Sequence, residues 1–290
     1  MEPFALERYF AKHEFSTEYL LSSSDCDGWA QSELLGLADP EARALWEDLR
    51  LGYSESLGHP LLRREIAALY KGVDPAQVLT AVPEEAILIA MNSLLERGDH
   101  VVCTFPGYRS LYSIAESLGC RVEKWRPEPE DGWRFDVDAL IGLLRPDTKL
   151  IIVNFPHNPT GQTLSPADYR RVVEAARERG IWLFSDEMYR LLELDAGARL
   201  PSACELYDKA ITLFGMSKSF GLAGTRVGWL VAKDKALFER MAAYKDYTTI
   251  CGAAPSELLA LIGLRAKETI LARHMSRIRR NLALLDEFLG

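Results

Sequence analysis

The sequence predicts an α/β protein built on a doubly wound, mostly parallel β-sheet. From about residue 84 to residue 232, short apolar segments alternate with segments of helical pattern. Strands that are apolar along their whole length are typical of a parallel sheet that helices cover on both faces. Right-handed crossovers between such strands wind the chain over both faces. The expected strands are 100–105, 120–125, 149–155, 181–186, 210–215 and 226–232.

The segments between these strands carry recognisable helix boundaries. Ser165 is an expected N-cap, Pro166 takes the first helical position and Asp168 lies in the first turn. Gly98 and Gly119 are expected to end two earlier helices. The expected helices lie within 83–99, 108–119, 136–144 and 165–180.

The two ends of the chain fall outside this alternating pattern. We expect residues 1–45 to form an N-terminal arm and part of a small domain, and residues 46–254 to form a large ligand-binding domain. A long helical pattern follows, so residues 255–290 are expected to be an interdomain helix and the start of the small domain. The sequence stops at NLALLDEFLG, in or just after a helix whose apolar face would normally pack against following residues. We therefore expect the small domain to lack its C-terminal part.

Composition and charge narrow the classes of partner. Of the 290 residues 48% are hydrophobic, which is ordinary for a folded protein, and the net charge is −8. That charge argues against a nucleic acid or an anionic membrane as the main partner, and no apolar run approaches the ~18 residues of a membrane span. The five cysteines and five histidines show no spacing typical of a metal site. The N-terminal segment lacks the apolar core of a signal peptide, so a cytoplasmic protein is expected.

Polar side chains follow several of the expected strands at the point where each strand ends. In open α/β sheets, ligands bind beyond the carboxyl ends of the strands. Taken singly, each of these residues has an ordinary structural explanation, such as a turn, a cap or a solvated loop lysine. Those explanations do not predict that all of them lie at one edge of the sheet. The residues are Tyr108, Asn158, Asp186, Tyr189, Lys218 and Arg226.

This combination of groups indicates pyridoxal 5′-phosphate chemistry. A lysine amine forms a Schiff base with an aldehyde, and a carboxylate keeps a pyridine nitrogen protonated so that the ring accepts electrons. An amide or a phenol hydrogen-bonds the ring oxygen, and an aromatic side chain stacks on the ring. A phosphate is held by hydroxyl groups, backbone N–H groups and a forked arginine.

Three motifs carry a resemblance to a known family. VNFPHNPTG, FSDEMYR and SKSFGLAGTRVGW occur in this order, and together they resemble the class I/II aminotransferases of fold type I. The resemblance runs from about residue 50 to the end of the sequence. It implies a transferase fold whose large domain has a seven-stranded sheet and binds pyridoxal phosphate.

The resemblance also implies roles for individual residues. Lys218 matches the Schiff-base lysine, which also moves the proton between the substrate Cα and the cofactor C4′. Asp186 matches the partner of the pyridine nitrogen, and Asn158 and Tyr189 match the pair on the ring oxygen. Tyr108 matches the stacking aromatic.

The phosphate end of the cofactor is assigned in the same way. Arg226 matches the phosphate arginine, and Ser217 is expected to add a hydroxyl. Tyr53 resembles a tyrosine that reaches the phosphate of the neighbouring subunit, which implies a homodimer. The sequence departs from the family pattern at TAVPEEAI, where Pro83 offers no N–H group, and at Gly215, where many members have serine. The arginine that binds the substrate α-carboxylate in the family has no match here.

The resemblance implies an aminotransferase that moves an amino group between an L-amino acid and a 2-oxo acid. A second hypothesis keeps the cofactor but changes the reaction, to a C–S lyase or to a capreomycidine-synthase-like cyclisation, which the LERYF and SSSDC stretches favour. A third hypothesis is a non-catalytic fragment that binds pyridoxal phosphate.

Overall fold

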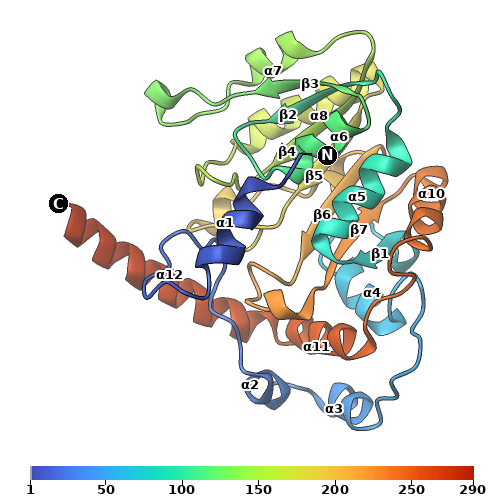
Figure 1. Ribbon diagram of the computed structural model, residues 1–290, viewed down its shortest axis with the longest axis vertical. Coiled ribbons are helices and arrows are strands. Elements are labelled where there is room, and N and C mark those ends of the chain that lie inside the picture. Colours follow the sequence, from blue (N-terminus) through green and yellow to red (C-terminus); the bar gives the residue numbers. More distant parts are fainter. Residues whose placement is uncertain (1) are drawn as a thin grey trace.

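The computed structural model describes residues 2–290, and a single seven-stranded sheet lies at its centre (Figure 1). The strands are β1 (Val78–Ala81), β2 (His100–Thr104), β3 (Arg121–Trp125), β4 (Thr148–Asn154), β5 (Trp182–Asp186), β6 (Ala210–Gly215) and β7 (Gly228–Ala232). They lie in the order β1-β7-β6-β5-β4-β2-β3. The run from β6 to β3 is parallel, whereas β7 pairs antiparallel with both β6 and β1. The predicted mostly parallel sheet is confirmed.

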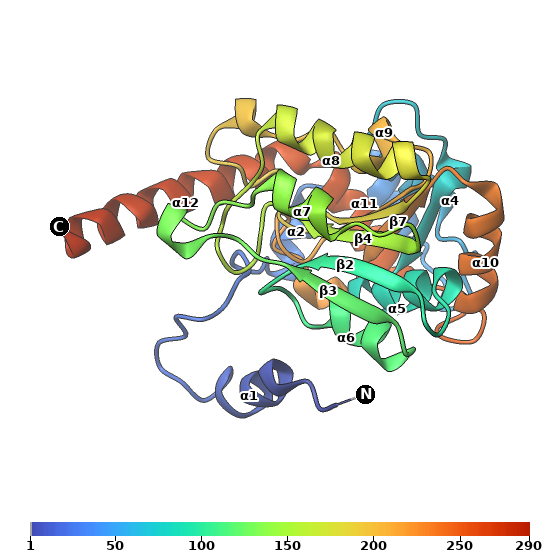
Figure 2. The same ribbon diagram turned by 90° about the horizontal axis from the view of Figure 1, so that it is seen from above.

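Helices cover both faces of the sheet, as Figure 2 shows from above. Successive strand residues point to opposite faces, so Leu213 packs in one apolar cluster and Phe214 in another. One face carries α5 (Pro83–Leu94), α6 (Ser110–Ser117) and α10 (Lys235–Lys245). The other carries α4 (Pro60–Ala67), α7 (Val137–Leu143), α8 (Pro166–Arg179), α9 (Ala203–Leu206) and α11 (Ala254–Arg265).

The boundaries of α8 follow the sequence prediction. The Ser165 hydroxyl accepts a hydrogen bond from the backbone N–H of Asp168 at 3.0 Å, and Pro166 occupies the first turn. Gly180 ends the helix in the left-handed conformation, with φ 64°. A side chain there would be strained, which is why glycine is favoured after a helix.

Two boundaries differ from the sequence prediction for local reasons. The expected strand 226–232 begins only at Gly228, because a 3₁₀ turn at Ala223–Thr225 leads into Arg226, whose φ is 56°. The expected helix 83–99 ends at Leu94, because Leu95 is already extended. The short strand β1 was not expected from the sequence. Its four residues pair with β7, where Val78 lies opposite Val231.

The ends of the chain extend from this body. Figure 2 shows α1 (Ala5–His13) set apart from the other helices and joined to them by an extended segment. Helices α2 (Gln31–Gly36) and α3 (Pro40–Glu47) follow it. Helix α12 (Lys267–Leu289) runs away from the sheet (Figure 1), and Leu282 and Leu285 near its end are exposed. Within residues 2–290, no helix combines the length and the apolar character needed to cross a membrane.

Candidate active site

A cavity of about 640 Å³ lies at the carboxyl edge of the parallel strands. The sheet brings together residues that are far apart in the sequence, because β2, β4, β5 and β6 all end at this edge. Seven of the eight predicted site residues line the cavity, and Tyr53 does not. The seven are Tyr108, Asn158, Asp186, Tyr189, Ser217, Lys218 and Arg226.

Lys218 enters the cavity from the loop that follows β6. Its Nζ donates a hydrogen bond to Ser24 Oγ at 3.0 Å and lies 4.0 Å from Asp25 Oδ1. The same amine lies 5.9 Å from the centre of the Tyr189 ring. The amine is therefore held by polar groups of the N-terminal segment at the wall of the cavity.

Asp186 is the last residue of β5 and lies in the wall of the cavity with only 4% of its surface exposed. Its Oδ1 accepts a hydrogen bond from the backbone N–H of Met188 at 3.0 Å. Burial raises the pKa of this carboxyl to about 7, and Lys218 only partly opposes the rise. Within residues 2–290 the carboxylate has no salt-bridge partner. A protonated ring nitrogen would supply the missing positive charge, so this residue fits the cofactor.

Asn158 and Tyr189 form a hydrogen-bonded pair. Asn158 Nδ2 donates to Tyr189 Oη at 3.0 Å, and burial raises the pKa of the phenol. Asn154, which the sequence analysis did not single out, holds this pair against β5. Its Oδ1 accepts from the backbone N–H of Asn158 at 2.9 Å, and its Nδ2 donates to the carbonyl of Asp186 at 3.1 Å. The only signal for Asn154 in the sequence is its place in the VNF motif.

Tyr108 is held from two sides. Its ring packs against Phe4 with 5.3 Å between ring centres, and its hydroxyl donates to Glu7 Oε1 at 3.4 Å. Behind it, His157 Nε2 donates to the carbonyl of Pro106 at 2.7 Å. Burial lowers the pKa of His157 to about 4, so this imidazole is neutral at neutral pH. The loop of Tyr108 is therefore tied to the loop that follows β4.

Two of the positions that depart from the family pattern, Pro83 and Gly215, lie in contact at the expected phosphate end of the cavity. A Cβ on Gly215 would lie 3.0 Å from Gly228 Cα and 3.3 Å from Pro83 Cγ. A Cβ on Gly228 would lie 2.8 Å from the same proline carbon. The pyrrolidine ring of Pro83 therefore packs into the space that these glycines leave open. The Cβ of a serine at residue 215 would crowd the backbone of Val227 and Gly228 as well as the ring of Pro83.

Glu84 follows Pro83 and lines the cavity. Its Oε1 accepts a hydrogen bond from the Ser110 hydroxyl, and its Oε2 is buried without a hydrogen-bond partner among the described residues. Ser217 and Arg226 complete this end of the cavity. Arg226 is available to a phosphate, because it is exposed and, among residues 2–290, its guanidinium donates only to the carbonyl of Ala223, at 3.2 Å.

The N-terminal arm contributes residues that the sequence analysis did not assign. Phe4, Glu7, Ser24 and Asp25 all line the cavity. Helix α1 buries none of its own residues. The sequence of the helix therefore did not indicate that it lies over the cavity. The LERYF and SSSDC stretches were the only signal in this part of the chain.

The fold and the cavity together define a pyridoxal-phosphate enzyme of fold type I. The family described as aminotransferase class I and II matches residues 18–288, and the chain belongs to this family. It is thus a pyridoxal-phosphate-dependent aminotransferase by family.

Individual relatives agree with this assignment. Capreomycidine synthase of Streptomyces vinaceus is 28% identical over 279 residues, which are 95% of this chain and 71% of that protein. Arginine–pyruvate transaminase AruH of Pseudomonas aeruginosa is 30% identical over 215 residues, 68% of this chain and 55% of that protein. The crystal structure of a PLP-dependent aminotransferase from Streptococcus suis superposes with a TM-score of 0.92 and 34% identity, over 99% of this chain and 76% of that one. The chain thus spans roughly half to three quarters of these relatives.

Proposed function

We propose that this cavity transfers an amino group between an L-amino acid and a 2-oxo acid, with Lys218 as the residue that bonds the cofactor. The observation that carries the proposal is the convergence of Lys218, Asp186 and the Asn158–Tyr189 pair on one cavity. When bound, pyridoxal 5′-phosphate supplies an aldehyde carbon and a ring that accepts electrons. The protein residues must hold that ring, orient it and move protons around it.

Each residue has a distinct task in this proposal. The amine of Lys218 would hold the cofactor, and the same amine would take and return the proton at the substrate Cα. Asp186 would keep the ring nitrogen protonated, because its carboxylate forms no salt bridge within the described residues and Lys218 only partly offsets its burial. Tyr189 accepts from Asn158, so its own proton is free for the ring oxygen. Ser217 and Arg226 bind the phosphate, and Tyr108 stacks on the ring.

A second candidate reaction is the cyclisation of an amino acid at the same cofactor. The relative named capreomycidine synthase aligns with 95% of this chain. Which bond at Cα breaks depends on how the substrate is held against the ring. The products of the reaction distinguish the two candidates, because only transamination releases a 2-oxo acid.

The wall of the cavity beside Tyr108 favours a substrate with a cationic side chain. Glu7 and Glu84 both face the phenol and, after burial, are the main causes that raise its pKa. A phenol has one proton and can donate it to only one of the two carboxylates. Neither carboxylate forms an ion pair within residues 2–290, so a guanidinium or ammonium group would find two acceptors here. The relative AruH is named for arginine.

The assembly and location are also proposals. Tyr53 is 92% exposed, which leaves it free to reach a neighbouring subunit in a homodimer. We propose a cytoplasmic protein, in keeping with five cysteines that are all free. The division into residues 1–45, 46–254 and 255–290 is likewise proposed.

Trapping of the cofactor tests the proposed function. The protein is mixed with pyridoxal 5′-phosphate, reduced with borohydride, digested and mapped by mass spectrometry. We expect the reduced cofactor on Lys218, and none in Lys218→Ala. Attachment to another lysine, or none in the wild type, would overturn the assignment.

A second experiment tests the reaction and the substrate class. Arginine, lysine, aspartate and glutamate are compared as amino donors, with the 2-oxo acid and the cyclic product measured separately. Faster turnover of aspartate than of arginine would contradict the cationic substrate class.

A further inference from the structure

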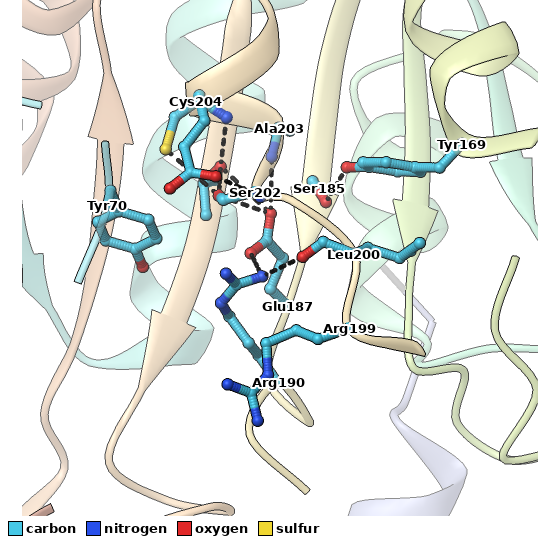
Figure 3. Close-up of polar contacts among 12 residues, drawn as sticks. Tyr70, Tyr169, Ser185, Glu187, Arg190, Arg199, Leu200, Ser202, Ala203 and Cys204 are labelled. Atoms are coloured by element: carbon cyan, nitrogen blue, oxygen red, sulfur yellow. Dashed lines mark hydrogen bonds and ion pairs between the residues drawn. The ribbon is translucent and has the colours of Figure 1, made fainter. Parts of the chain in front are cut away.

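A buried carboxylate lies directly behind the candidate active site. Glu187 follows Asp186, and because successive residues at a strand end point to opposite sides, its side chain points away from the cavity. Only 4% of Glu187 is exposed, yet it is not among the residues that line the cavity. Figure 3 shows it between Arg190 on one side and Ser202 and Ala203 on the other.

Glu187 joins three segments of the chain. Its Oε1 accepts hydrogen bonds from Ser202 Oγ at 2.9 Å and from the backbone N–H of Ala203 at 3.0 Å. Its Oε2 lies 3.5 Å from Arg190 Nη1 but has no hydrogen-bond partner among the described residues, whereas Arg190 Nη1 donates to the carbonyl of Leu200 at 2.7 Å (Figure 3). The Ser202 hydroxyl continues the network to Thr212 Oγ1 on β6, at 3.1 Å.

Arg190 connects this network to the loop of Lys218. The hydroxyl of Ser219, the residue after Lys218, donates a hydrogen bond to the backbone carbonyl of Arg190. Ser219 is fully buried. The backbone N–H of Arg190 also donates to the carbonyl of Glu187 at 2.8 Å, and this bond closes the turn that contains Tyr189. The two residues of this buried ion pair therefore contact the segment of Asp186 and Tyr189 and, through the backbone carbonyl of Arg190, the loop of Lys218.

A buried ion pair is a costly way to fill this space. Removing two charges from water costs free energy that their attraction barely recovers, and apolar residues of similar volume often stabilise a protein equally well. A charged pair does, however, fix direction, because a guanidinium must meet its acceptors in plane. Fixed direction matters most beside a catalytic site, where small displacements of reacting groups cost large factors in rate.

We propose that Glu187 and Arg190 are positioning residues that fix the positions of Tyr189 and Lys218 relative to each other across the cavity. The effect of this positioning on catalysis rests on the proposed function. Neither side chain lines the cavity. They act through the turn at residues 187–190 and through the hydrogen bond from Ser219 to Arg190.

A neighbouring ion pair provides a matched control. Glu193 Oε2 accepts from Arg199 Nε at 2.9 Å, and the Glu193 side chain is only 6% exposed. This pair has the same chemistry and a similarly buried carboxylate, although the Arg199 side chain is 34% exposed and that of Arg190 is 14% exposed. It has no hydrogen bond to the loop of Lys218 among the described residues. Glu187→Gln and Glu193→Gln each remove one negative charge and keep the shape of the side chain.

Hydrogen–deuterium exchange on the cofactor-free proteins tests the coupling without reference to activity. We expect Glu187→Gln to speed exchange in both segments 187–190 and 216–221, and Glu193→Gln to leave segment 216–221 unchanged. Faster exchange confined to segment 200–204 in Glu187→Gln would overturn the proposal, because the pair would then only anchor α9. Equal effects of both variants on segment 216–221 would also overturn it.

Steady-state kinetics then test the catalytic consequence in the loaded enzyme. Glu187→Gln and Ser219→Ala are each expected to lower kcat about tenfold or more with KM within about twofold, and their double variant to fall little further. The pH at which the visible absorption of the lysine-bound cofactor changes should shift in both. Additive losses, or a kcat equal to that of Glu193→Gln, would contradict a shared positioning role. Failure of the wild type to attach the cofactor would instead contradict the proposed function and leave the exchange result to stand alone.

Discussion

Asp186 and His157 are both buried near the cavity, and burial shifts their pKa values in opposite directions. For each group burial disfavours the charged form, so the pKa of Asp186 rises to about 7 and that of His157 falls to about 4. In the pH range between the ordinary and the shifted value, the native protein binds more protons than the unfolded chain at Asp186 and fewer at His157. Stability therefore falls with rising pH through Asp186 and falls with decreasing pH through His157.

The first prediction concerns Asp186→Asn in the cofactor-free protein. Between pH 3.8 and about 7, Asp186 is ionised in the unfolded chain but protonated in the native protein, so stability falls by up to ~1.4 kcal/mol per pH unit as the pH rises. Asparagine does not titrate, so the stability of the wild type relative to the variant should fall by about 1–2 kcal/mol from about pH 5 to about pH 6.5. Urea unfolding of both proteins at the two pH values measures this difference. A difference that stays constant would mean that the carboxyl is ionised and satisfied without the cofactor.

At the scale of single residues, the sequence predicted the residues that line the cavity better than the residues that hold them in place. Six of the seven cavity residues were found because their types and their places after strands have a chemical meaning, and Ser217 was added by the resemblance to the family. Asn154 and Glu187 were not assigned because their roles come from bonds to residues of other strands, and no local pattern records such bonds. Glu7 belongs to a helix whose position over the cavity depends on contacts some 100 residues away, as in its bond to Tyr108.

At the scale of the elements, the start of α5 lies in close contact with the last residue of β6, Gly215, and the first residue of β7, Gly228. The second prediction is that Gly215→Ala destabilises the protein by about 1–3 kcal/mol, because its Cβ would lie 3.0 Å from backbone and 3.3 Å from the ring of Pro83. Thermal or urea unfolding measures the change. Gly142→Ala is a suitable control, since nothing lies within 4 Å of the added carbon and the residue is inside α7. Equal stability of Gly215→Ala and the wild type would show that this contact relaxes without cost.

The third prediction separates binding from stability in α1. This helix buries none of its residues, and Phe4, which precedes it, packs on Tyr108 at the cavity. Phe4→Ala should therefore change the free energy of unfolding by less than about 0.5 kcal/mol, as for other substitutions outside the core. It should raise KM for the amino donor, because the arm that closes the cavity loses its anchor. Urea unfolding and initial rates measure the two quantities. A loss of stability without a change in KM would assign α1 to the fold and not to the site.

The elements also show why strand β1 and the direction of β7 could not be predicted from the sequence. The expected strands other than 120–125 are apolar runs bounded by turns, and all six expected strands form. The four residues of β1 gain their strand structure only from pairing with β7, so their own sequence is too short to indicate it. The direction of β7 is set by a short return from β6 and not by a helical crossover, and this makes it antiparallel.

For the whole molecule, the question is whether the site is complete within one chain. Tyr53 is the one predicted cofactor residue outside the cavity of its own chain, and its side chain is 92% exposed. Leu51 and Tyr247 are also strongly exposed, at 84% and 92%. Ser54 donates a hydrogen bond to the carbonyl of Gly252, which ties the segment of Tyr53 to the segment that follows α10. Exposed aromatic and aliphatic groups on tied segments are what a dimer interface would cover.

The fourth prediction uses this arrangement. If Tyr53 binds the phosphate of the neighbouring subunit, Tyr53→Phe loses a hydrogen bond to a charged group, which weakens cofactor binding by about 1.5–3 kcal/mol, or roughly 10- to 100-fold in Kd. Lys218→Ala, by contrast, disables the site of its own chain. A heterodimer of the two variants then contains one site with Lys218 from one chain and Tyr53 from the other.

Two affinity tags isolate that heterodimer, and titration with pyridoxal 5′-phosphate measures its affinity at the site that retains Lys218. If Tyr53 binds the phosphate of the neighbouring subunit, this one site should have wild-type affinity, because neither Lys218 nor Tyr53 is changed in it. Action within one chain predicts the weak affinity of Tyr53→Phe, because the chain that carries Lys218 then carries Phe at position 53. A protein that stays monomeric at the concentrations of the titration, yet binds the cofactor with wild-type affinity, would remove Tyr53 from the site altogether. The heterodimer therefore decides whether the catalytic unit is one chain or two.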